Sequence, residues 1–221
     1  MSAATEPTTL FRTGRSMVIA ALLLGLFALL GSAMVAITEH YTAPRIAANQ
    51  RAELLQSLQT LLPSGSYDND LLADTLTVSS REWLGTEAPV TLYRARLGTT
   101  PVAVILSVVA PDGYSGDIHL LVAIYADGRI AGVRVVAHQE TPGLGDRIEL
   151  RRSDWILGFN ARSLRDPMDA GWRVKKDGGL FDQFTGATIT PRAVVAAVRR
   201  TLHYFEAERE QLLAPKEVNH E

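Results

Sequence analysis

The stretch that decides the fold is I-H-L-L-V-A-I-Y-A-D-G-R-I-A-G-V-R-V-V, residues 118–136. Two apolar, β-branched runs, 118–125 and 129–136, flank the pair Asp127-Gly128. That pair is a strong signal for a tight turn between antiparallel strands. Gly132, inside the second run, predicts a bulge or a close approach of another segment to the backbone. We therefore expect a β-hairpin at the centre of the chain.

Further strands are predicted on the N-terminal side of this hairpin, at 75–79, 91–97 and 102–109. Helical spacing of apolar residues predicts helices over 44–62, 147–159 and 191–213. Strands in the middle and helices at the ends are typical of an α+β domain with a mostly antiparallel sheet flanked by helices. We place this single domain at 64–213, followed by a frayed polar tail, 214–221.

Residues 17–37 contain no charged residue and are long enough to cross a bilayer as one helix. Arg12 and Arg15 precede this run, which favours a cytoplasmic N-terminus, 1–16, and a domain outside the cytoplasm. Residues 38–63 then form a helical stalk. The alternative is a cleaved signal peptide, because small residues end the run. The length of the apolar run favours an uncleaved anchor, since signal-peptide cores are shorter.

Composition excludes several classes of function. The 221 residues include no cysteine, which excludes disulfides, thiolate iron–sulfur ligation, thiol nucleophiles and cysteine-linked cofactors. The formal net charge is −2, and no basic stripe carries interleaved aromatic residues, so nucleic acid is not an expected partner. The five histidines show no metal-ligand spacing, and no metal is expected.

The segment F-T-G-A-T-I-T-P, residues 184–191, precedes the last predicted helix. We expect Thr190 to cap that helix and Pro191 to occupy its first position. The start of a helix is a suitable place for a phosphate, and Gly186 leaves its approach open. The alternative is a turn that only caps the helix.

A second segment, H-Q-E-T-P-G-L-G-D, residues 138–146, follows the hairpin directly. Its proline and two glycines predict a loop. Glu140 and Thr141 offer polar groups and Leu144 offers an apolar face, a mixture that suits a planar heteroaromatic ring. The alternative is a purely structural connector.

Taken together and in this order, D-G-Y-S-G (112–116), the Asp-Gly hairpin, the 138–146 loop and T-G-A-T-I-T (185–190) resemble the flavin mononucleotide (FMN)-binding domain of RnfG/RsxG, a component of the Rnf/Rsx electron-transport complex. The resemblance runs from the apolar segment almost to the C-terminus. NqrC, a component of the sodium-pumping NADH:quinone reductase, is a relative. The compact length and the longer 138–146 loop favour RnfG.

The resemblance implies that FMN is bound as a phosphoester to Thr188, the last threonine of the T-G-A-T motif. It also implies that Glu140, Thr141, Gly143, Leu144 and Gly145 border the flavin ring. The motif residues Thr185, Gly186 and Ala187 would surround the phosphate. Thr188 is then a modified residue and no catalytic residue is expected. Lys175, Lys176 and Arg192 are either ordinary surface residues or further support for the phosphate charge.

The implied function is that of an electron-carrier subunit in a membrane-bound, ion-translocating oxidoreductase complex of the bacterial inner membrane, with the main domain in the periplasm. It would act with other subunits and would not be a free-standing enzyme. The implied partners are those subunits, a flavin transferase of the ApbE type, and membrane lipid. Three alternatives remain: an NqrC-like subunit, a non-redox anchored binding domain, and a flavin-dependent regulator or reductase that works alone.

Overall fold

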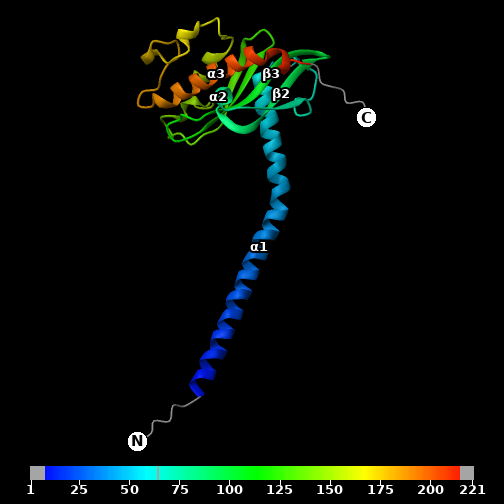
Figure 1. Cartoon of the computed structure of the whole chain (residues 1–221), viewed down its shortest axis with the longest axis vertical. Coiled ribbons are helices and arrows are strands. Elements are labelled where there is room, and N and C mark those ends of the chain that lie inside the picture. Colours follow the sequence, from blue (N-terminus) through cyan, green and yellow to red (C-terminus); the bar gives the residue numbers. More distant parts are fainter. Residues whose placement is uncertain (1–7, 64, 215–221) are drawn as a thin grey trace. The chain divides into compact units, whose positions relative to one another are not determined.

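The structure is a computed structural model that describes residues 8–63 and 65–214, with side chains from residue 17 onward (Figure 1). Most of the predicted tail, 214–221, and residues 1–7 of the predicted cytoplasmic segment lie outside the described residues. The chain divides into two compact units, with the boundary between Glu53 and Leu54.

The strands lie in the middle of the chain, between the long helices α1 and α3. The helices are α1 (Thr8–Leu61), α2 (Arg81–Leu84) and α3 (Ile189–Leu212), and the strands are β1 (Thr75–Ser80), β2 (Thr86–Leu97), β3 (Thr100–Ala110), β4 (Ile118–Tyr125) and β5 (Ile130–Ala137). Four short 3₁₀ helices, η1 (Asp146–Ile148), η2 (Asp154–Phe159), η3 (Asp169–Gly171) and η4 (Lys175–Asp177), lie between β5 and α3.

The five strands form one antiparallel sheet in which each strand pairs with its neighbours in sequence, in the order β1-β2-β3-β4-β5. The predicted α+β class with a mostly antiparallel sheet is therefore confirmed. Both strands of the predicted hairpin are present, and Gly128 has a positive φ of 91° in its turn. A hairpin of this kind needs no long connection, which is why the central strands could be identified from local sequence.

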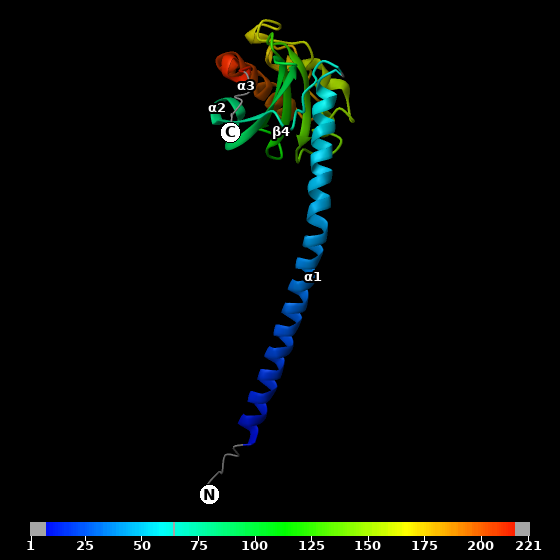
Figure 2. The ribbon, with the colours of Figure 1, turned by 90° about the vertical axis from the view of Figure 1, so that its right-hand side faces the viewer.

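Both faces of the sheet are buried, and alternate residues serve the two faces. Figure 2 shows α3 on one side of the strands and the last turns of α1 on the other. Leu106, Leu120 and Val122 belong to the larger core, which includes the inner side of α3. Ile105 and Leu121 belong to a second core with the last turns of α1, from Leu54 onward. A strand buried on both faces reads as a continuous apolar run, as β3 and β4 do. Burying each such side chain contributes roughly 1.5–3 kcal/mol.

Gly132 has both features that its place in the sequence predicts. The register between β4 and β5 shifts next to it, between Ala123 and Ile124. A Cβ atom at Gly132 would lie 3.0 Å from Leu61 Cδ2. The end of α1 therefore packs directly against the backbone of β5.

The predicted helix over 147–159 is wrong: this segment contains only η1 and η2. Ser153, which lies between them, is extended, with φ −162° and ψ 159°. Its hydroxyl accepts a hydrogen bond from Trp155 N–H and donates one to the Arg147 carbonyl. Serine in this role ends one helical segment and caps the next. The short helix α2 was not predicted, and β2 begins five residues earlier than expected, at Thr86.

The first unit is the part of α1 that precedes Leu54. All of its side chains from residue 17 to residue 53 are exposed. Among the described residues, one helix is long and apolar enough to cross a membrane, and its most apolar stretch has a mean hydropathy of 2.6. None of that stretch is buried, unlike the core helix of a soluble protein. This helix fits a single-pass membrane anchor.

Candidate functional site

Residues of the two loops singled out in the sequence line one cavity of about 300 Å³. Its lining comprises Tyr114, Glu140, Thr141, Leu144, Gly145, Gly186, Ala187, Thr188, Ile189 and Thr190. Of the predicted site residues, only Gly143 and Thr185 are not in this lining. Residues more than forty positions apart in sequence are thus brought together by the packing of α3 against the sheet.

Thr188 is the residue that immediately precedes the helix α3. It has helical backbone angles, φ −78° and ψ −27°, and its side chain does not cap the helix. Within the part of the chain that the structure describes, the Thr188 hydroxyl forms no hydrogen bond. The amides of Ile189 and Thr190, the first two residues of the helix, have no intrahelical acceptor. An unused hydroxyl therefore stands beside amide donors at the positive end of a helix.

The prediction that Thr190 caps α3 is wrong. Thr190 is the second residue of the helix and is fully buried, and its hydroxyl donates a hydrogen bond to Glu140 Oε2. Pro191 is consequently the third helical residue, where its missing N–H still has no intrahelical acceptor to lose. A buried acceptor from the 138–146 loop draws the Thr190 side chain inward, and this tertiary contact outweighs the local capping preference.

Glu140 connects three segments. Only 4% of it is exposed. Its Oε1 accepts a hydrogen bond of 2.9 Å from the Ser115 amide, and its Oε2 accepts the Thr190 hydroxyl. The carboxyl group thereby joins the D-G-Y-S-G turn, its own loop and the first turn of α3. Removing it would leave a buried hydroxyl and a backbone amide without their acceptors.

Two glycines are required by the shape of the site. A Cβ atom at Gly145 would lie 2.8 Å from Glu140 Oε2 and 3.0 Å from Thr190 Oγ1, closer than ordinary contacts allow. Gly186 has a positive φ of 83°, which L-residues with side chains rarely adopt. A side chain would therefore clash at Gly145, predicted to border the flavin ring, and would strain the backbone at Gly186, predicted to leave the approach of a phosphate open.

The 138–146 loop is held from behind by a histidine. His138 Nδ1 accepts the Glu140 amide at 3.0 Å, and His138 Nε2 lies 2.8 Å from Glu149 Oε1. The Arg151 guanidinium and His138 together lower the pKa of Glu149 to about 2, against the opposing effect of burial. Because Glu149 is then ionised and the Glu140 amide donates to Nδ1, the hydrogen bond between His138 and Glu149 is donated by Nε2–H.

The T-G-A-T loop is anchored by the aromatic residue before it. Phe184 is 4% exposed and packs edge-on against Trp155, with ring centroids 5.2 Å apart. The Arg147 guanidinium lies over the Phe184 ring, 5.2 Å from its centroid, in a cation–π geometry. These contacts fix the loop immediately before Thr188.

Tyr114 and Ile189 also line the cavity, although we did not predict them individually. Tyr114 is 67% exposed, Ile189 45% and Leu144 43%. Three large apolar or aromatic side chains thus border one cavity while remaining accessible. Tyr114 could have been selected from the D-G-Y-S-G turn, whereas Ile189 carries no signal in the sequence beyond its position after Thr188.

The basic residues considered for phosphate binding do not line this cavity. Lys175 pairs with Asp182 at 2.6 Å, and Arg192 pairs with Asp177 at 2.6 Å. Arg192 instead lines a separate depression, and Lys176 lines neither. The surface interpretation of these three residues fits the structure.

Comparison with known proteins gives two domain matches. The sequence profile of the FMN-binding domain matches residues 113–203, a range that includes every predicted site residue. The profile of the RnfG N-terminal region matches residues 1–61. The chain is also 58% identical over 206 residues to the G subunit of the ion-translocating oxidoreductase complex of Pseudomonas aeruginosa (strain UCBPP-PA14), covering 93% of this chain and 96% of that protein. This chain belongs to the RnfG family.

Other members are similar over nearly the same length. The G subunit of the same complex from Shewanella loihica is 51% identical, with 90% of this chain and 94% of that protein covered. The one from Vibrio cholerae serotype O1 is 46% identical, with 86% and 91% covered. The expected resemblance to RnfG is therefore confirmed, and it is preferred over NqrC. The FMN-binding match supports FMN as the cofactor and an electron-transport role for this RnfG chain.

Proposed function

We propose that this chain is an electron-carrier subunit that holds FMN by a phosphoester to Thr188 and relays electrons between other redox subunits of a membrane-bound Rnf-type complex. The observation that carries the proposal is the free Thr188 hydroxyl at the start of α3, inside the cavity that the two motifs build. When bound, FMN supplies one-electron and two-electron redox chemistry.

The residues that line the cavity fit both the phosphate and the ring of FMN. The amides of Ile189 and Thr190 suit the negative charge that a phosphodiester keeps. The exposed side chains of Tyr114, Leu144 and Ile189 offer apolar contact to a flat ring, and Glu140 and Thr141 offer polar contact at its edge. A cavity of about 300 Å³ is at the lower end of the range for small-molecule sites. A covalent bond would retain a ligand that the cavity does not enclose.

The ester forms when the Thr188 oxygen bonds to the phosphorus of a flavin nucleotide donor, the P–O bond between that phosphorus and the donor's leaving group breaks, and the departing oxygen takes up the proton that Thr188 loses. The net change in mass is that of FMN less one water. We propose that a flavin transferase of the ApbE type makes this bond, so Thr188 is modified once and does not act in turnover. In a compartment with little free FMN, a noncovalent complex would lose its cofactor by mass action.

We further propose that α1 spans the bacterial inner membrane, with residues 1–16 in the cytoplasm and the domain in the periplasm. The charge-free segment 17–37 and the arginines before it support this orientation. Membrane lipid then surrounds the span. The proposal also includes the division of the remaining chain into a stalk, 38–63, an FMN-binding domain, 64–213, and a tail, 214–221.

Intact-mass measurement of the full-length chain, purified from its native host, tests the ester. We expect wild-type protein to carry the added mass, Thr188→Ala to lose it, and Thr188→Ser to retain it because the hydroxyl remains. Thr99→Ala is the matched control, because it removes an exposed threonine hydroxyl outside both loops and should leave the ester on Thr188. Unmodified wild-type protein from cells that contain the transferase would overturn the proposal.

Two further measurements separate the role from its alternatives. Co-purification with other redox subunits supports a carrier in a complex. NADH oxidation by the isolated chain would instead indicate a reductase that works alone, and a colourless, unmodified chain would indicate a non-redox binding domain.

A further inference from the structure

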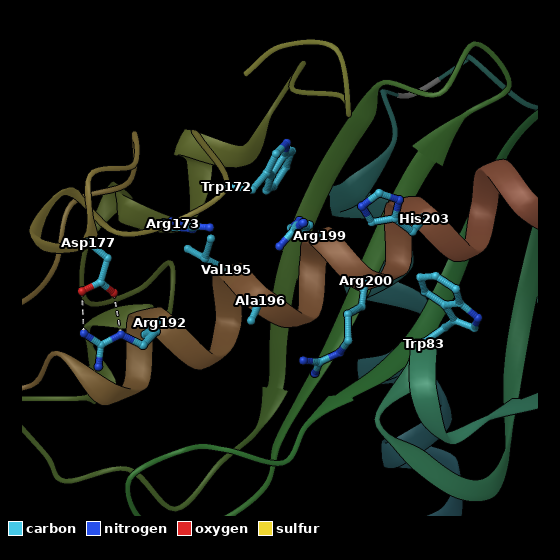
Figure 3. Close-up of a pocket in the computed structure, with 10 residues that line it drawn as sticks. All are labelled: Trp83, Trp172, Arg173, Asp177, Arg192, Val195, Ala196, Arg199, Arg200 and His203. Carbon is cyan, nitrogen blue, oxygen red and sulfur yellow. Dashed lines mark hydrogen bonds and ion pairs between the residues drawn. The ribbon is translucent and has the colours of Figure 1, made fainter. Parts of the chain in front are cut away.

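A second depression, of about 620 Å³, lies along α3 and shares no lining residue with the candidate flavin site (Figure 3). We call it the basic groove and define it by six of its residues: Trp83, Arg173, Arg192, Arg199, Arg200 and His203. Its complete lining contains four arginines and one aspartate, whereas the whole chain has a net charge of −2. Positive charge is therefore concentrated here against the average of the molecule.

Two of the arginines form bidentate pairs with carboxylates from the segment before α3. Arg192 donates two hydrogen bonds to Asp177, at 2.6 and 2.8 Å. Arg199 donates two to Asp169, at 2.7 and 2.6 Å. Paired forks of this kind fix the position of a guanidinium group. The walls of the basic groove are thus ordered before any partner arrives, which lowers the entropic cost of binding.

The other two arginines carry charge without a paired carboxylate. Within residues 8–63 and 65–214, neither Arg173 nor Arg200 forms an ion pair. Arg173 is exposed and Arg200 is half-buried. In Figure 3, Arg199 and Arg200 leave α3 in different directions, between the Arg192–Asp177 pair at one end and Trp83 with His203 at the other. Free guanidinium groups in an ordered groove are suited to bind carboxylates in pairs of hydrogen bonds.

The far end of the basic groove is aromatic. Trp83, from α2, is only partly buried, and its ring centroid lies 5.9 Å from that of His203. Arg192 and His203 are eleven positions apart on α3. At 1.5 Å per residue this is about 16 Å of helix, which equals the length of roughly five residues of extended chain. The groove therefore has the length of a short peptide segment and is longer than a single anion requires.

We propose that the basic groove docks an extended acidic segment of another subunit of the complex. Two or more carboxylates of that segment pair with Arg173 and Arg200, and an apolar side chain contacts Trp83. Charge complementarity selects this partner, and arginine and tryptophan are the residues that most often dominate the energy of interfaces. The inference depends on membership of a complex and does not depend on the flavin ester.

The location of the groove suits a carrier subunit. Arg192 follows Thr188 by four positions, about one turn of α3. A partner segment in the basic groove is therefore held beside the turn of the helix that bears the proposed flavin site.

Charge reversal tests the proposal in the native host. The tagged full-length chain is purified from solubilised membranes over a range of salt, and the co-purified subunits of the complex are quantified. We expect Arg200→Glu, and Arg173→Glu as a second variant at an exposed position, to reduce co-purification roughly tenfold or more at low salt, because attraction becomes repulsion. Melting temperatures equal to that of the wild type exclude misfolding as the cause.

Arg165→Glu is the matched control. Arg165 is also exposed, forms no ion pair among the described residues and lines a different depression, with Asp127 and Arg129. Its reversal makes the same change in net charge and should leave co-purification unchanged. Equal effects of Arg165→Glu and Arg200→Glu would overturn the proposal, because they would show a general response to charge.

Photo-crosslinking identifies the occupant. A photoreactive residue replaces Ala196, which lines the groove. We expect mass spectrometry to find a peptide of another subunit with at least two acidic residues. Crosslinks only to anionic lipid, or to a segment without acidic residues, would overturn the proposal. Flavin fluorescence of the Arg200→Glu preparation separates the two proposals. If flavin is present and co-purification is unchanged, only the docking proposal is refuted.

Discussion

At the scale of single residues, the candidate site depends on contacts that converge on Glu140. Its carboxyl group is buried and serves two donors, and Gly145 packs against it without a side chain. A site packed in this way tolerates few substitutions, because each group fills the space that its neighbour leaves.

Gly145→Ala tests this packing. The added Cβ would overlap Glu140 and the Thr190 hydroxyl, so we expect a loss of about 1–3 kcal/mol in the free energy of unfolding, together with lower flavin content. Chemical denaturation of the full chain in detergent, with flavin fluorescence, measures both. Gly158→Ala is the control, because a Cβ atom there would have no other described atom within 4 Å. Equal stability of Gly145→Ala and wild type would contradict the description of the site.

The ion pair behind the loop predicts a dependence on pH. The pKa of Glu149 falls from 4.5 to about 2 on folding, chiefly through Arg151. A lowered pKa contributes stability that is present above pH 4.5 and is lost as the pH falls toward 2. We therefore expect Glu149→Gln to lower the melting temperature at pH 6, with the difference from wild type shrinking between pH 4.5 and 2. Glu87→Gln, which removes an exposed carboxylate, should have nearly the melting temperature of the wild type both at pH 6 and between pH 4.5 and 2.

Residue types at the site were largely predictable, whereas some of their roles were not. The glycines and Glu140 could be selected from the two loops because unusual backbone and polar residues stand out in sequence. The hydrogen bond between Thr190 and Glu140 could not be predicted, since its partners are 50 positions apart and local rules favour a cap. The same limit applies to Ile189, whose contact with the cavity depends on where α3 packs.

At the scale of elements, a buried ion-pair cluster fastens the end of α3 to the edge of the sheet. Asp74 accepts hydrogen bonds from Arg94 at 2.7 Å and from Arg96 at 2.6 Å, and both arginines also donate to the Ala214 carbonyl. Burial opposes ionisation of Asp74, but the two arginines outweigh it and keep its pKa below the usual value. The one described residue of the predicted frayed tail is therefore held in place.

Asp74→Ala should break this cluster and leave two buried guanidinium groups without their carboxylate. We expect a loss of about 3–5 kcal/mol in the free energy of unfolding, as for other broken buried pairs. Thermal unfolding of the full chain measures it. Asp127→Ala, which removes an exposed partner of Arg129, is the comparison and should cost no more than about 1 kcal/mol. Similar losses for both variants would show that the Asp74 cluster behaves as a surface pair.

The strands were more predictable than the segments that connect them to α3. Alternation, β-branched residues and the Asp127-Gly128 turn are local signals, and β4 has the predicted bounds. Pro89 concealed the first part of β2, because proline is usually read as a break in a strand. The 3₁₀ segments between β5 and α3 are held by distant contacts, such as that of Trp155 Nε1 with the Asp182 carbonyl, which no local pattern reveals.

At the scale of the whole molecule, the apolar part of α1 determines where the domain works. Its residues 17–37 carry no charge, so the proposed span offers no ionisable group for ion conduction, and in the proposed complex translocation would require other subunits.

Leu24→Arg tests the anchor. An arginine near the centre of a span costs about 2.5–3.5 kcal/mol for insertion, so we expect a larger fraction of the chain to be released from membranes by alkaline carbonate. Gln50→Arg, on the same helix but outside the apolar stretch, should remain bound like the wild type. A wild-type chain that begins after the small residues at 31–33 would instead show that the segment is a cleaved signal peptide.

The three-way junction at Glu140 has a consequence for maturation. Its partners Ser115 and Thr190 are 25 and 50 positions away in sequence, so the pocket closes only after the sheet and the last helix have come together. If the transferase recognises that assembled pocket, an unfinished chain offers it no target. Flavinylation would then serve as quality control, and only correctly folded copies would carry the cofactor.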